Sequence, residues 1–393
     1  MSCFGSPNII TPNLDQMAKE GIRLTSYYSA QAVCSASRAG LLTGCYPNRI
    51  GISGALSPRS NHGINSGETT LAEMLKANGY STGIFGKWHL GDNYPSRPSD
   101  QGFDESLIHL AGGMGQVGDF TNYFKKDTSY FDPILWHNNK QKPYKGYCSD
   151  IFTENAIEFI EKNKNNPFFC YLSFNAPHNP LQVPDEYYQA YKTLDPTDGI
   201  DPELIPNEKI SEKTKDNTRK VYAMVTNIDD NLKKLFNKVD ELGIKDNTIV
   251  IFMTDNGPQH ARYIAGMKGR KSSVYNGGIR VPFFLRFPAM FRGNQEVNQI
   301  TAHIDLLPTL SKLCNVEMPR DRKIDGRSFI PSINSEKLPE RSFFSYWTRK
   351  YPELFNNIAL QRGQFKLIGK TDYNSPIENF ELYDTNSLGC SSQ

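Results

Sequence analysis

The sequence lacks several features that would assign a protein to a class at once. It contains no N-x-S/T acceptor, no C-x-x-C pair, no internal repeat and no low-complexity segment. Its seven cysteines are scattered, a spacing typical neither of a zinc site nor of a dense disulfide scaffold. No apolar run approaches the length of a membrane-spanning helix, and no secretory signal is visible after Met1. We therefore expect no membrane partner.

An excess of charge of one sign is also missing. The 44 lysines and arginines nearly balance 42 acidic residues, which leaves a net charge of +2. This balance gives no support for a nucleic-acid partner, because nucleic-acid binding needs a clustered basic face. The chain of 393 residues, with 38% hydrophobic residues, can bury a large core. Its length predicts one large domain with a smaller one, or two domains.

The most informative stretch is CSASRAGLLTG, residues 34–44. Its small polar residues suit the start of a helix, and the apolar residues that follow suit the helix itself. Cys34 would then lie where unpaired backbone N–H groups and the helix dipole favour negative charge, with Arg38 close by. Such surroundings stabilise a thiolate or a bound anion. A buried structural cysteine beside a surface arginine is the alternative interpretation.

Further polar side chains follow predicted strands. The strand expected at 81–86 leads into Lys87 and His89, which alternation places on one side of the chain. A cation and a titratable imidazole together suit an anionic ester and proton transfer. His178 follows the apolar run 168–174, which predicts a buried parallel strand. The alternatives are a surface lysine, a capping histidine and an ordinary loop histidine.

Asp255 and Asn256 follow the clearest buried strand, residues 248–253. A carboxylate and an amide oxygen side by side are ligands suited to Ca²⁺ or Mg²⁺. A simple Asp-Asn-Gly turn is the alternative. Because open α/β sheets place their sites at the carboxyl ends of strands, we expect these two residues to lie near His178.

These motifs, taken in order, resemble those of the sulfatase family. CSASRAGLLTG resembles the signature C-x-P/A-S-R-A-x-L-L-T-G, and GKWHLG matches the second signature. The family's A-P-H-x-P and D-N-G segments are present at residues 176–180 and 255–257. GRKSSVYNGGIRVP resembles G-K-G-x-x-Y-E-G-G-I/V-R-x-P, and counting back four from Tyr275 selects Lys271 rather than Lys268. The resemblance covers nearly the whole chain.

The resemblance implies a modified nucleophile and a metal. In the family, the cysteine at position 34 is oxidised to formylglycine by a formylglycine-generating or sulfatase-maturing enzyme. Its hydrated aldehyde is the nucleophile, held by Arg38 and by Ca²⁺ (or Mg²⁺). The implied metal ligands are Asp255, Asn256 and residue 34 itself.

The resemblance also assigns roles to the remaining side chains. Lys87 and Lys271 would contact the sulfate group. His89 would hydrogen-bond the formylglycine hydroxyl and help expel sulfate, and His178 would protonate the leaving alcohol. The implied substrate is a sulfated small molecule or glycan, and the implied compartment is periplasmic or extracellular.

The expected fold is α/β. A large, mostly parallel sheet sandwiched by helices, as in alkaline phosphatase, is expected over residues 1–324. Short strand candidates from 341 onward predict a small antiparallel sheet as a second domain, residues 325–393. Helices are expected at 12–20, 71–78, 149–163 and 220–239, with Thr11 and Thr70 as caps of the first two.

The sequence departs from the family in several places. In the family, a buried strand ending in two metal-binding aspartates precedes the segment that begins this chain, and nothing in residues 1–10 is acidic. We therefore expect the first strand, both aspartates and the end of the second domain to be missing, and little turnover from these 393 residues. Ala36 replaces the proline of the broadly accepted maturation motif, and Asn276 stands where the family has glutamate.

Three functional interpretations remain open. The first is a metal-dependent sulfatase acting on aryl or carbohydrate sulfate esters. The second is a phosphate or phosphonate monoesterase of the same superfamily. The third is a catalytically inactive homologue that binds anions or partners, a hypothesis based on the absent aspartate pair.

Overall fold

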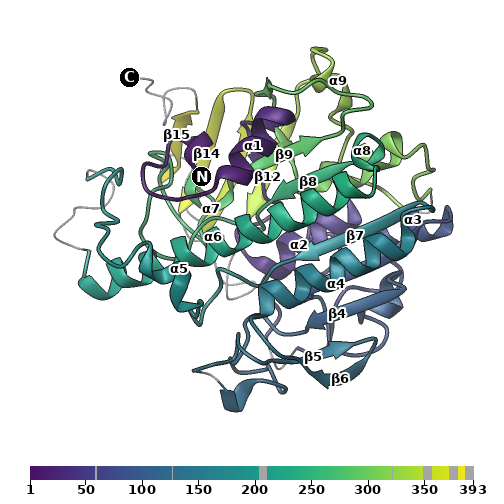
Figure 1. The fold of residues 1–393 in the computed structure, drawn as a ribbon. Coiled ribbons are helices and arrows are strands. Elements are labelled where there is room, and N and C mark those ends of the chain that lie inside the picture. The colour runs from purple at the N-terminus through teal and green to yellow at the C-terminus, as the bar shows by residue number, and fades with distance from the viewer. Residues whose placement is uncertain are drawn as a thin grey trace.

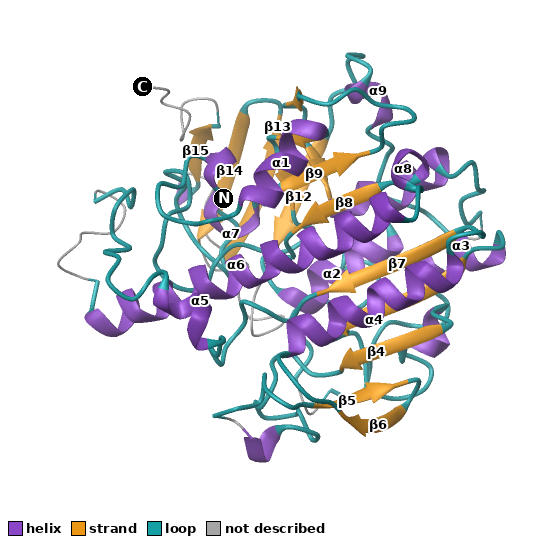
Figure 2. Cartoon of the chain, viewed as in Figure 1, coloured by secondary structure: helices purple, strands orange, loops and turns teal. Residues whose placement is uncertain are grey.

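The structure is a computed structural model of the chain. It describes residues 1–57, 60–125, 127–202, 210–320, 322–347, 356–370 and 379–385. The helices and strands form layers, with sheet strands between two sets of helices and a separate small sheet near the end of the chain (Figure 2). None of the helices in these ranges is long and apolar enough to cross a membrane.

One sheet carries the strands that lead to Lys87 and His178. Its strand order is β6-β5-β4-β3-β7. The central strand β3 pairs in parallel with both β4 and β7, whereas β5 and β6 add an antiparallel hairpin. The bounds are β3 Ser81–Lys87, β4 Glu105–His109, β5 Ile134–His137, β6 Lys140–Pro143 and β7 Phe168–Ser173.

A second sheet has the order β10-β1-β9-β8. Here β1 pairs in parallel with β10, but β9 runs antiparallel to both β1 and β8. A short parallel pair, β2 with β11, lies apart from it. The α/β class is confirmed, but the sheets are mixed rather than mostly parallel. The bounds are β1 Ile22–Leu24, β2 Tyr27–Tyr28, β8 Val250–Met253, β9 Phe283–Arg286, β10 Gln295–Val297 and β11 Thr301–Ala302.

A gap divides the expected single sheet into these two sheets. Strands β7 and β8 have their arrowheads at the same end, and both line a cavity of about 1340 Å³ (Figure 2). Within the described residues, β7 pairs only with β3 and β8 only with β9. Side chains such as Leu14, Leu42 and Ile228 close the cavity from the helix layers. The two apolar strands are therefore only partly buried.

Helices cover both faces of the strands. On one face, α1, α4 and α6 lie in front of the strands in Figure 1, and on the other α2 lies behind them. Of the second group, α2 contacts both α3 and α8. The bounds are α1 Pro12–Glu20, α2 Cys34–Thr43, α3 Leu71–Ala77, α4 Cys148–Asn163, α5 Asp185–Gln189, α6 Glu212–Glu241, α7 Asn276–Ile279, α8 Leu306–Leu313 and α9 Ile330–Ile333. Single 3₁₀ turns are η1 Ser2–Phe4, η2 Pro98–Gln101, η3 Tyr123–Lys125, η5 Lys245–Asn247 and η6 His303–Asp305.

The two predicted helix caps behave differently. Thr70 and Glu73 form a complete capping box at the start of α3, as the sequence predicts. Thr11 stands at the N-cap position of α1, as predicted, but its hydroxyl makes no capping bond. Instead, the carboxylate of Asp229 in α6 accepts from the backbone N–H of Leu14 at 2.8 Å. A contact 215 residues away in the sequence thus replaces the local cap.

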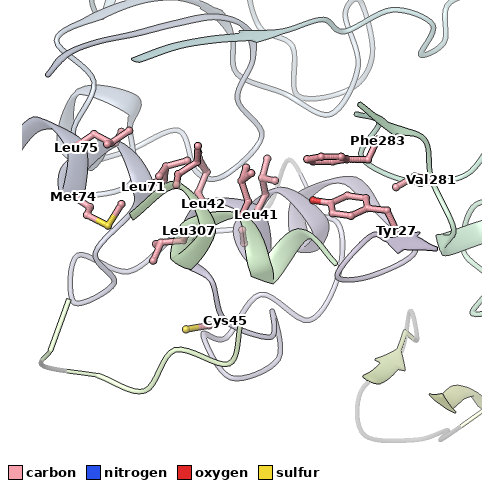
Figure 3. Close-up of a cluster of buried hydrophobic side chains, with 14 of the residues drawn as sticks. Tyr27, Leu41, Leu42, Cys45, Leu71, Met74, Leu75, Val281, Phe283 and Leu307 are labelled. Carbon is pink, nitrogen blue, oxygen red and sulfur yellow. The ribbon is translucent and has the colours of Figure 1, made fainter. Parts of the chain in front are cut away.

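The core beneath α2 fixes the start of that helix. In Figure 3, Leu42 of α2 lies beside Leu71 of α3, and Leu41 lies between Leu42 and Phe283 of β9. All four side chains are buried. Because a cavity left by a truncated core leucine costs roughly 2–5 kcal/mol, this packing holds α2 firmly against the sheets.

The small C-terminal sheet has the order β12-β13-β14-β15 and is antiparallel throughout, as predicted. Its strands are β12 Ser342–Tyr346, β13 Asn356–Arg362, β14 Phe365–Lys370 and β15 Glu381–Asp384. Ala359 and Ile368 pack against Val274 and Tyr275, next to the segment that carries Lys271. The division of the chain into two domains at residue 325 stays a prediction.

Candidate active site

Cys34 is the first residue of α2, where the sequence places it. Its side chain is 4% exposed, and its Sγ lies 3.2 Å from Nδ1 of His89. Val33 is the extended residue before the helix and offers no side-chain cap. The first backbone N–H groups of α2 and its dipole therefore act on the group at position 34.

The charges around Cys34 favour an anion there. Burial alone would raise the pKa of the thiol, but Lys87, His89 and Lys271 together pull this pKa well below its ordinary value. A buried site that still favours a thiolate is a site built for negative charge. The six described cysteines are free thiols.

His89 is oriented by its second nitrogen. Nε2 lies 2.9 Å from the backbone carbonyl of Leu56, which can only accept a hydrogen bond. The Nε2–H therefore donates, and Nδ1 carries the lone pair that faces Cys34. His89 has a φ of 58°, so the predicted alternation with Lys87 is broken at this residue. Both side chains nevertheless lie beside Cys34.

Lys87 ends β3 and is almost fully buried. Its ammonium donates to the backbone carbonyl of Gly112 at 2.6 Å. Burial lowers the pKa of Lys87 to about 8, against an opposing attraction from Cys34 and a further lowering by Arg38. A bound anion would give this buried ammonium a negatively charged partner and would stabilise its charged form.

Arg38 connects the two sheets across the gap. Its Nε and Nη2 donate to Oδ2 of Asp255 at 3.2 and 3.1 Å. Its Nη1 donates to the carbonyl of Lys87 at 3.0 Å and to the hydroxyl of Ser173. These bonds commit the guanidinium to Asp255 and to the ends of β3 and β7. The contact of Arg38 with a modified residue 34, which the family resemblance implies, stays a prediction.

Lys271 and His178 line the cavity together. His178 Nδ1–H donates to the carbonyl of Asn179 at 2.8 Å, which leaves Nε2 as the acceptor. Burial, together with Lys87 and Lys271, lowers the pKa of His178 to about 2, so the imidazole is neutral. By contrast, Lys268 bonds Tyr383 at 2.8 Å in the C-terminal sheet. The structure therefore separates the two lysines as the spacing predicts.

Asp255 and Asn256 follow β8 and line the same cavity. Burial would raise the pKa of Asp255, but Arg38, Lys87 and Lys271 hold this pKa far below its usual range. The Oδ1 atom of Asn256 is buried and has no hydrogen-bond partner. An ionised carboxylate and an unpartnered amide oxygen are the chemistry that Ca²⁺ or Mg²⁺ prefers.

The number of these donors is too small to form a complete metal site. Across the described ranges, no group of three or more His, Cys, Asp or Glu side chains could hold a metal. Ca²⁺ takes about six to eight oxygen ligands, and Asp255 already shares Oδ2 with Arg38. The residues present therefore do not by themselves fit a resident divalent cation.

Sequence reasoning missed a buried positioning group, His303 in η6. Its Nε2–H donates to the carbonyl of Thr254 at 3.1 Å, and its Nδ1 accepts from the hydroxyl of Ser37 at 2.8 Å. Burial lowers the pKa of His303 to about 4 and keeps it neutral. His303 thus ties the end of β8 to α2. The signal in the sequence is the segment HIDLLPTL, which begins at His303 and resembles a helix-start segment of the family.

With this geometry in view, comparison with known proteins assigns the family. The pattern of the Sulfatase family matches residues 1–316, and the pattern of the C-terminal part of N-sulphoglucosamine sulphohydrolase matches residues 269–388. The first match covers most of the chain. This chain belongs to the sulfatase family.

The relatives are longer than this chain. The uncharacterized sulfatase YdeN of Escherichia coli (strain K12) is 30% identical over 379 residues, covering 88% of this chain and 61% of the relative. The arylsulfatase of Hemicentrotus pulcherrimus is 29% identical over 384 residues, covering 93% and 64%. The chain thus spans less than two thirds of the length of these two relatives.

Solved structures share the fold. The crystal structure of Ps i-CgsB in complex with k-i-k-neocarrahexaose has a TM-score of 0.80 at 30% identity, covering 97% of this chain and 82% of that one. The phosphonate monoester hydrolase of Agrobacterium radiobacter has a TM-score of 0.68 at 17% identity, covering 99% and 87%. The second likeness shows the fold alone. Both agree with the alkaline-phosphatase-like architecture expected from the sequence.

Proposed function

We propose that the protein hydrolyses sulfate monoesters of aryl or carbohydrate alcohols, with Cys34 as the precursor of its nucleophile. One observation carries this proposal. Position 34 is buried at a helix N-terminus, and the lysines at 87 and 271 with His89 favour negative charge there. A sulfate ester brings a single negative charge and three oxygens to such a place.

Formylglycine at position 34, formed by a formylglycine-generating or sulfatase-maturing enzyme, would when hydrated supply an oxygen nucleophile. The surrounding residues then have separate roles in charge neutralisation and proton transfer. Lys87 and Lys271 neutralise the sulfate oxygens as charge shifts in the transition state. His89 Nδ1 takes a proton from the hydroxyl at position 34, because Nε2–H is held by Leu56.

His178 is the candidate partner of the leaving group. It is neutral in the absence of substrate, and Nε2 is its available nitrogen. A bound sulfate ester adds negative charge beside it, which raises the pKa of the imidazole toward the range needed for a general acid. Arg38 bonds the carboxylate of Asp255, and His303 joins Thr254, at the end of β8, to Ser37 of α2. These bonds keep Asp255 close to the start of α2.

We also propose that Asp255 and Asn256 are two ligands of a Ca²⁺ or Mg²⁺ ion that would polarise the sulfate oxygens. The unpartnered Oδ1 of Asn256 supports this assignment. The further ligands have to come from the group at position 34, from the substrate, from water or from other segments. We expect turnover by these 393 residues to be small for the same reason.

The experiment is production of the chain together with a sulfatase-maturing enzyme. The tryptic peptide that contains position 34 should lose the thiol sulfur and gain an aldehyde. Long incubations with p-nitrophenyl sulfate and p-nitrophenyl phosphate, in millimolar Ca²⁺, then test the reaction, and Cys34→Ala is the blank. Release from the sulfate ester above the blank supports the proposal. An intact thiol together with no release above the blank contradicts it.

Two other functions have observations in their favour. The fold shared with a phosphonate monoester hydrolase supports a phosphate or phosphonate monoesterase, which faster release from the phosphate ester would favour. The small number of metal donors supports a catalytically inactive homologue that binds anions. Tight sulfate binding without turnover, even with a converted residue 34, would favour that function. We propose a periplasmic or secreted location, as the family resemblance implies.

A further inference from the structure

Residues 271–274 form a short segment between the candidate active site and the C-terminal sheet. Lys271 lines the cavity, but within the described residues no hydrogen bond or ion pair holds its ammonium. Lys87, by contrast, donates from its ammonium to the carbonyl of Gly112. The place of the Lys271 ammonium therefore depends on the backbone that carries it.

The backbone of this segment has a conformation that its own residues do not favour. Ser272 has a φ of 71°, in the left-handed region that residues other than glycine seldom adopt. Such a conformation persists only where surrounding contacts hold it. On one side, the N–H of Lys271 donates to the carbonyl of Pro258 at 2.8 Å, and the N–H of Ser272 donates to that of Ala32 at 3.0 Å. The segment is thus bonded to the chain just before Cys34.

Asn357 of β13 holds the segment from the side of the C-terminal sheet. Its Nδ2 donates to the carbonyl of Ser272 at 2.7 Å, and its Oδ1 accepts from the N–H of Val274 at 2.9 Å. Both ends of the side-chain amide therefore bond the backbone of one short segment. No other side chain of similar size offers a donor and an acceptor in this arrangement.

A β-bulge gives Asn357 its place. In the pairing of β13 with β14, Asn356 lies opposite Lys370 and Ile358 lies opposite Gly369, which leaves Asn357 as an extra residue. Its own φ is 70°, and asparagine tolerates this left-handed conformation better than most residues. Because an extra residue interrupts the alternation of a strand, a bulge can direct a side chain that regular pairing would place elsewhere.

A second contact from the C-terminal sheet follows a few residues later. Lys366 of β14 is buried, and its Nζ donates to Oδ1 of Asn276 at 2.8 Å, at the start of α7. Between the two contacts, Val274 is buried in the apolar cluster that it shares with the C-terminal sheet. The sheet therefore holds the chain on both sides of Val274, next to Lys271.

We propose that Asn357 is a positioning residue of the candidate active site, which acts from the C-terminal sheet by holding Lys271 where its ammonium meets a bound sulfate group. This inference rests on the proposed function, in which Lys271 contacts the sulfate oxygens. None of the described residues of the C-terminal sheet lines the cavity. The sheet thus contributes to anion binding through the backbone of 271–274 and not through a contact with the anion.

The test measures the affinity for inorganic sulfate by calorimetry, which requires neither a metal nor a converted Cys34. Asn357→Gly removes both side-chain bonds but keeps a residue that accepts a φ of 70°. We expect sulfate to bind about fivefold more weakly to this variant. Asn315→Gly is the matched control and should leave the affinity unchanged. Asn315 is also left-handed, with a φ of 52°, and its exposed side chain makes no bond to the described residues.

A double-mutant cycle separates positioning from a general loss of structure. In a chain that carries Lys271→Ala, Asn357→Gly should cause no further weakening, because the group that Asn357 holds in place is already absent. Deuterium exchange gives an independent measurement. A peptide that covers 272–277 should exchange faster in Asn357→Gly than in the unsubstituted chain, whereas a peptide that covers 81–87 should not change.

Two outcomes overturn the inference. Asn357→Gly leaves the affinity for sulfate unchanged although Lys271→Ala weakens it, or Asn357→Gly weakens binding equally with and without Lys271. Failure of the proposed function gives a different pattern. In that case Lys271→Ala leaves the affinity for sulfate unchanged, or the unsubstituted chain binds no sulfate, and the inference is overturned together with the proposed function.

Discussion

The two sides of the pocket differ in how complete they are. On the side of β3 and β7, Lys87, His89 and His178 each have a defined hydrogen-bond partner, and Lys87 and His89 lie beside Cys34. On the side of β8, Asp255 is shared with Arg38, and Asn256 holds an oxygen without a partner. The groups proposed to bind an anion are each held by a hydrogen bond, whereas the groups proposed to bind a metal are too few for a complete site.

This difference follows from where each group obtains its support. Lys87 is held by the end of β3 and by the carbonyl of Gly112 after β4, whereas the backbone of Lys271 is held by the carbonyl of Pro258 after β8. The oxygen ligands lie at the edge of the gap, where β8 has no neighbour on its second side within the described residues. Anion binding and metal binding are therefore separable properties of this chain, and each can be measured alone.

Ca²⁺ titration gives the largest expected effect. Because Asp255 and Asn256 supply only two oxygen donors, we expect a dissociation constant for Ca²⁺ of about 1 mM or weaker. This value is at the weak end of known protein sites. Turnover of p-nitrophenyl sulfate should then lie at least roughly a thousandfold below the typical enzyme value of about 10 s⁻¹. Calorimetry and a long-time assay check both. Micromolar Ca²⁺ affinity with robust turnover would show that the metal side is complete.

Removal of the arginine that joins the two sides comes next. Arg38→Ala leaves the carboxylate of Asp255 without its partner in a largely buried place, and we expect a loss of about 3 kcal/mol in the free energy of unfolding. Arg320→Ala, in an exposed pair with Glu317, should cost under about 1 kcal/mol. Urea unfolding measures both. Equal losses for the two variants would mean that Arg38 does not hold the sides together.

The pH dependence of anion binding sharpens the comparison further. Lys87 has a pKa of about 8, so its ammonium is charged below that pH and neutral above it. The affinity for inorganic sulfate should be constant from pH 6 to about 7 and fall up to about tenfold per pH unit above 8. Lys87→Met should bind more weakly and lose this dependence. An affinity for sulfate that stays constant up to pH 9 would mean that Lys87 does not supply the positive charge that binds sulfate.

Hydrogen exchange is expected to show the smallest effect. Strand β3 is paired on both sides, whereas β7 and β8 are each paired on one side in the described part of the chain. Peptides that cover 168–173 and 250–253 should therefore exchange a part of their amides faster than a peptide that covers 81–87. Mass spectrometry after deuterium labelling measures this. Uniformly slow exchange in all three would indicate that the gap is covered in solution.

Much of the fold was predictable because its elements have strong local patterns. The expected helix 149–163 is Cys148–Asn163, and the strand expected at 248–253 contains β8, Val250–Met253. The helix expected at 220–239 is longer, Glu212–Glu241, because its polar first turns carry no apolar stripe to predict them. Thr11 is the N-cap residue of α1 as expected, but the carboxylate that accepts from the first turn belongs to Asp229, which lies too far away in the sequence to be predicted.

The candidate site was predictable as a set of residues but not as a set of bonds. Local sequence placed Cys34 at the start of a helix and put Lys87, His178 and Asp255 at strand ends. It gave no sign that Arg38 spans the two sheets or that His303 holds the end of β8. Such bonds depend on which strand ends come together, which no local pattern records.

The sequence by itself determined the longer helices, the strands that precede Lys87, His178 and Asp255, the strands of the small C-terminal sheet, the family and the chemical types expected at the site. The tertiary structure alone decided the gap between β7 and β8, the tautomers of the histidines and the protonation of Lys87. The physical reason is the distance along the sequence over which each interaction acts. Backbone preferences and hydrophobic periodicity act between neighbours in the chain, whereas burial and charge act between groups that only the folded state brings within a few ångströms.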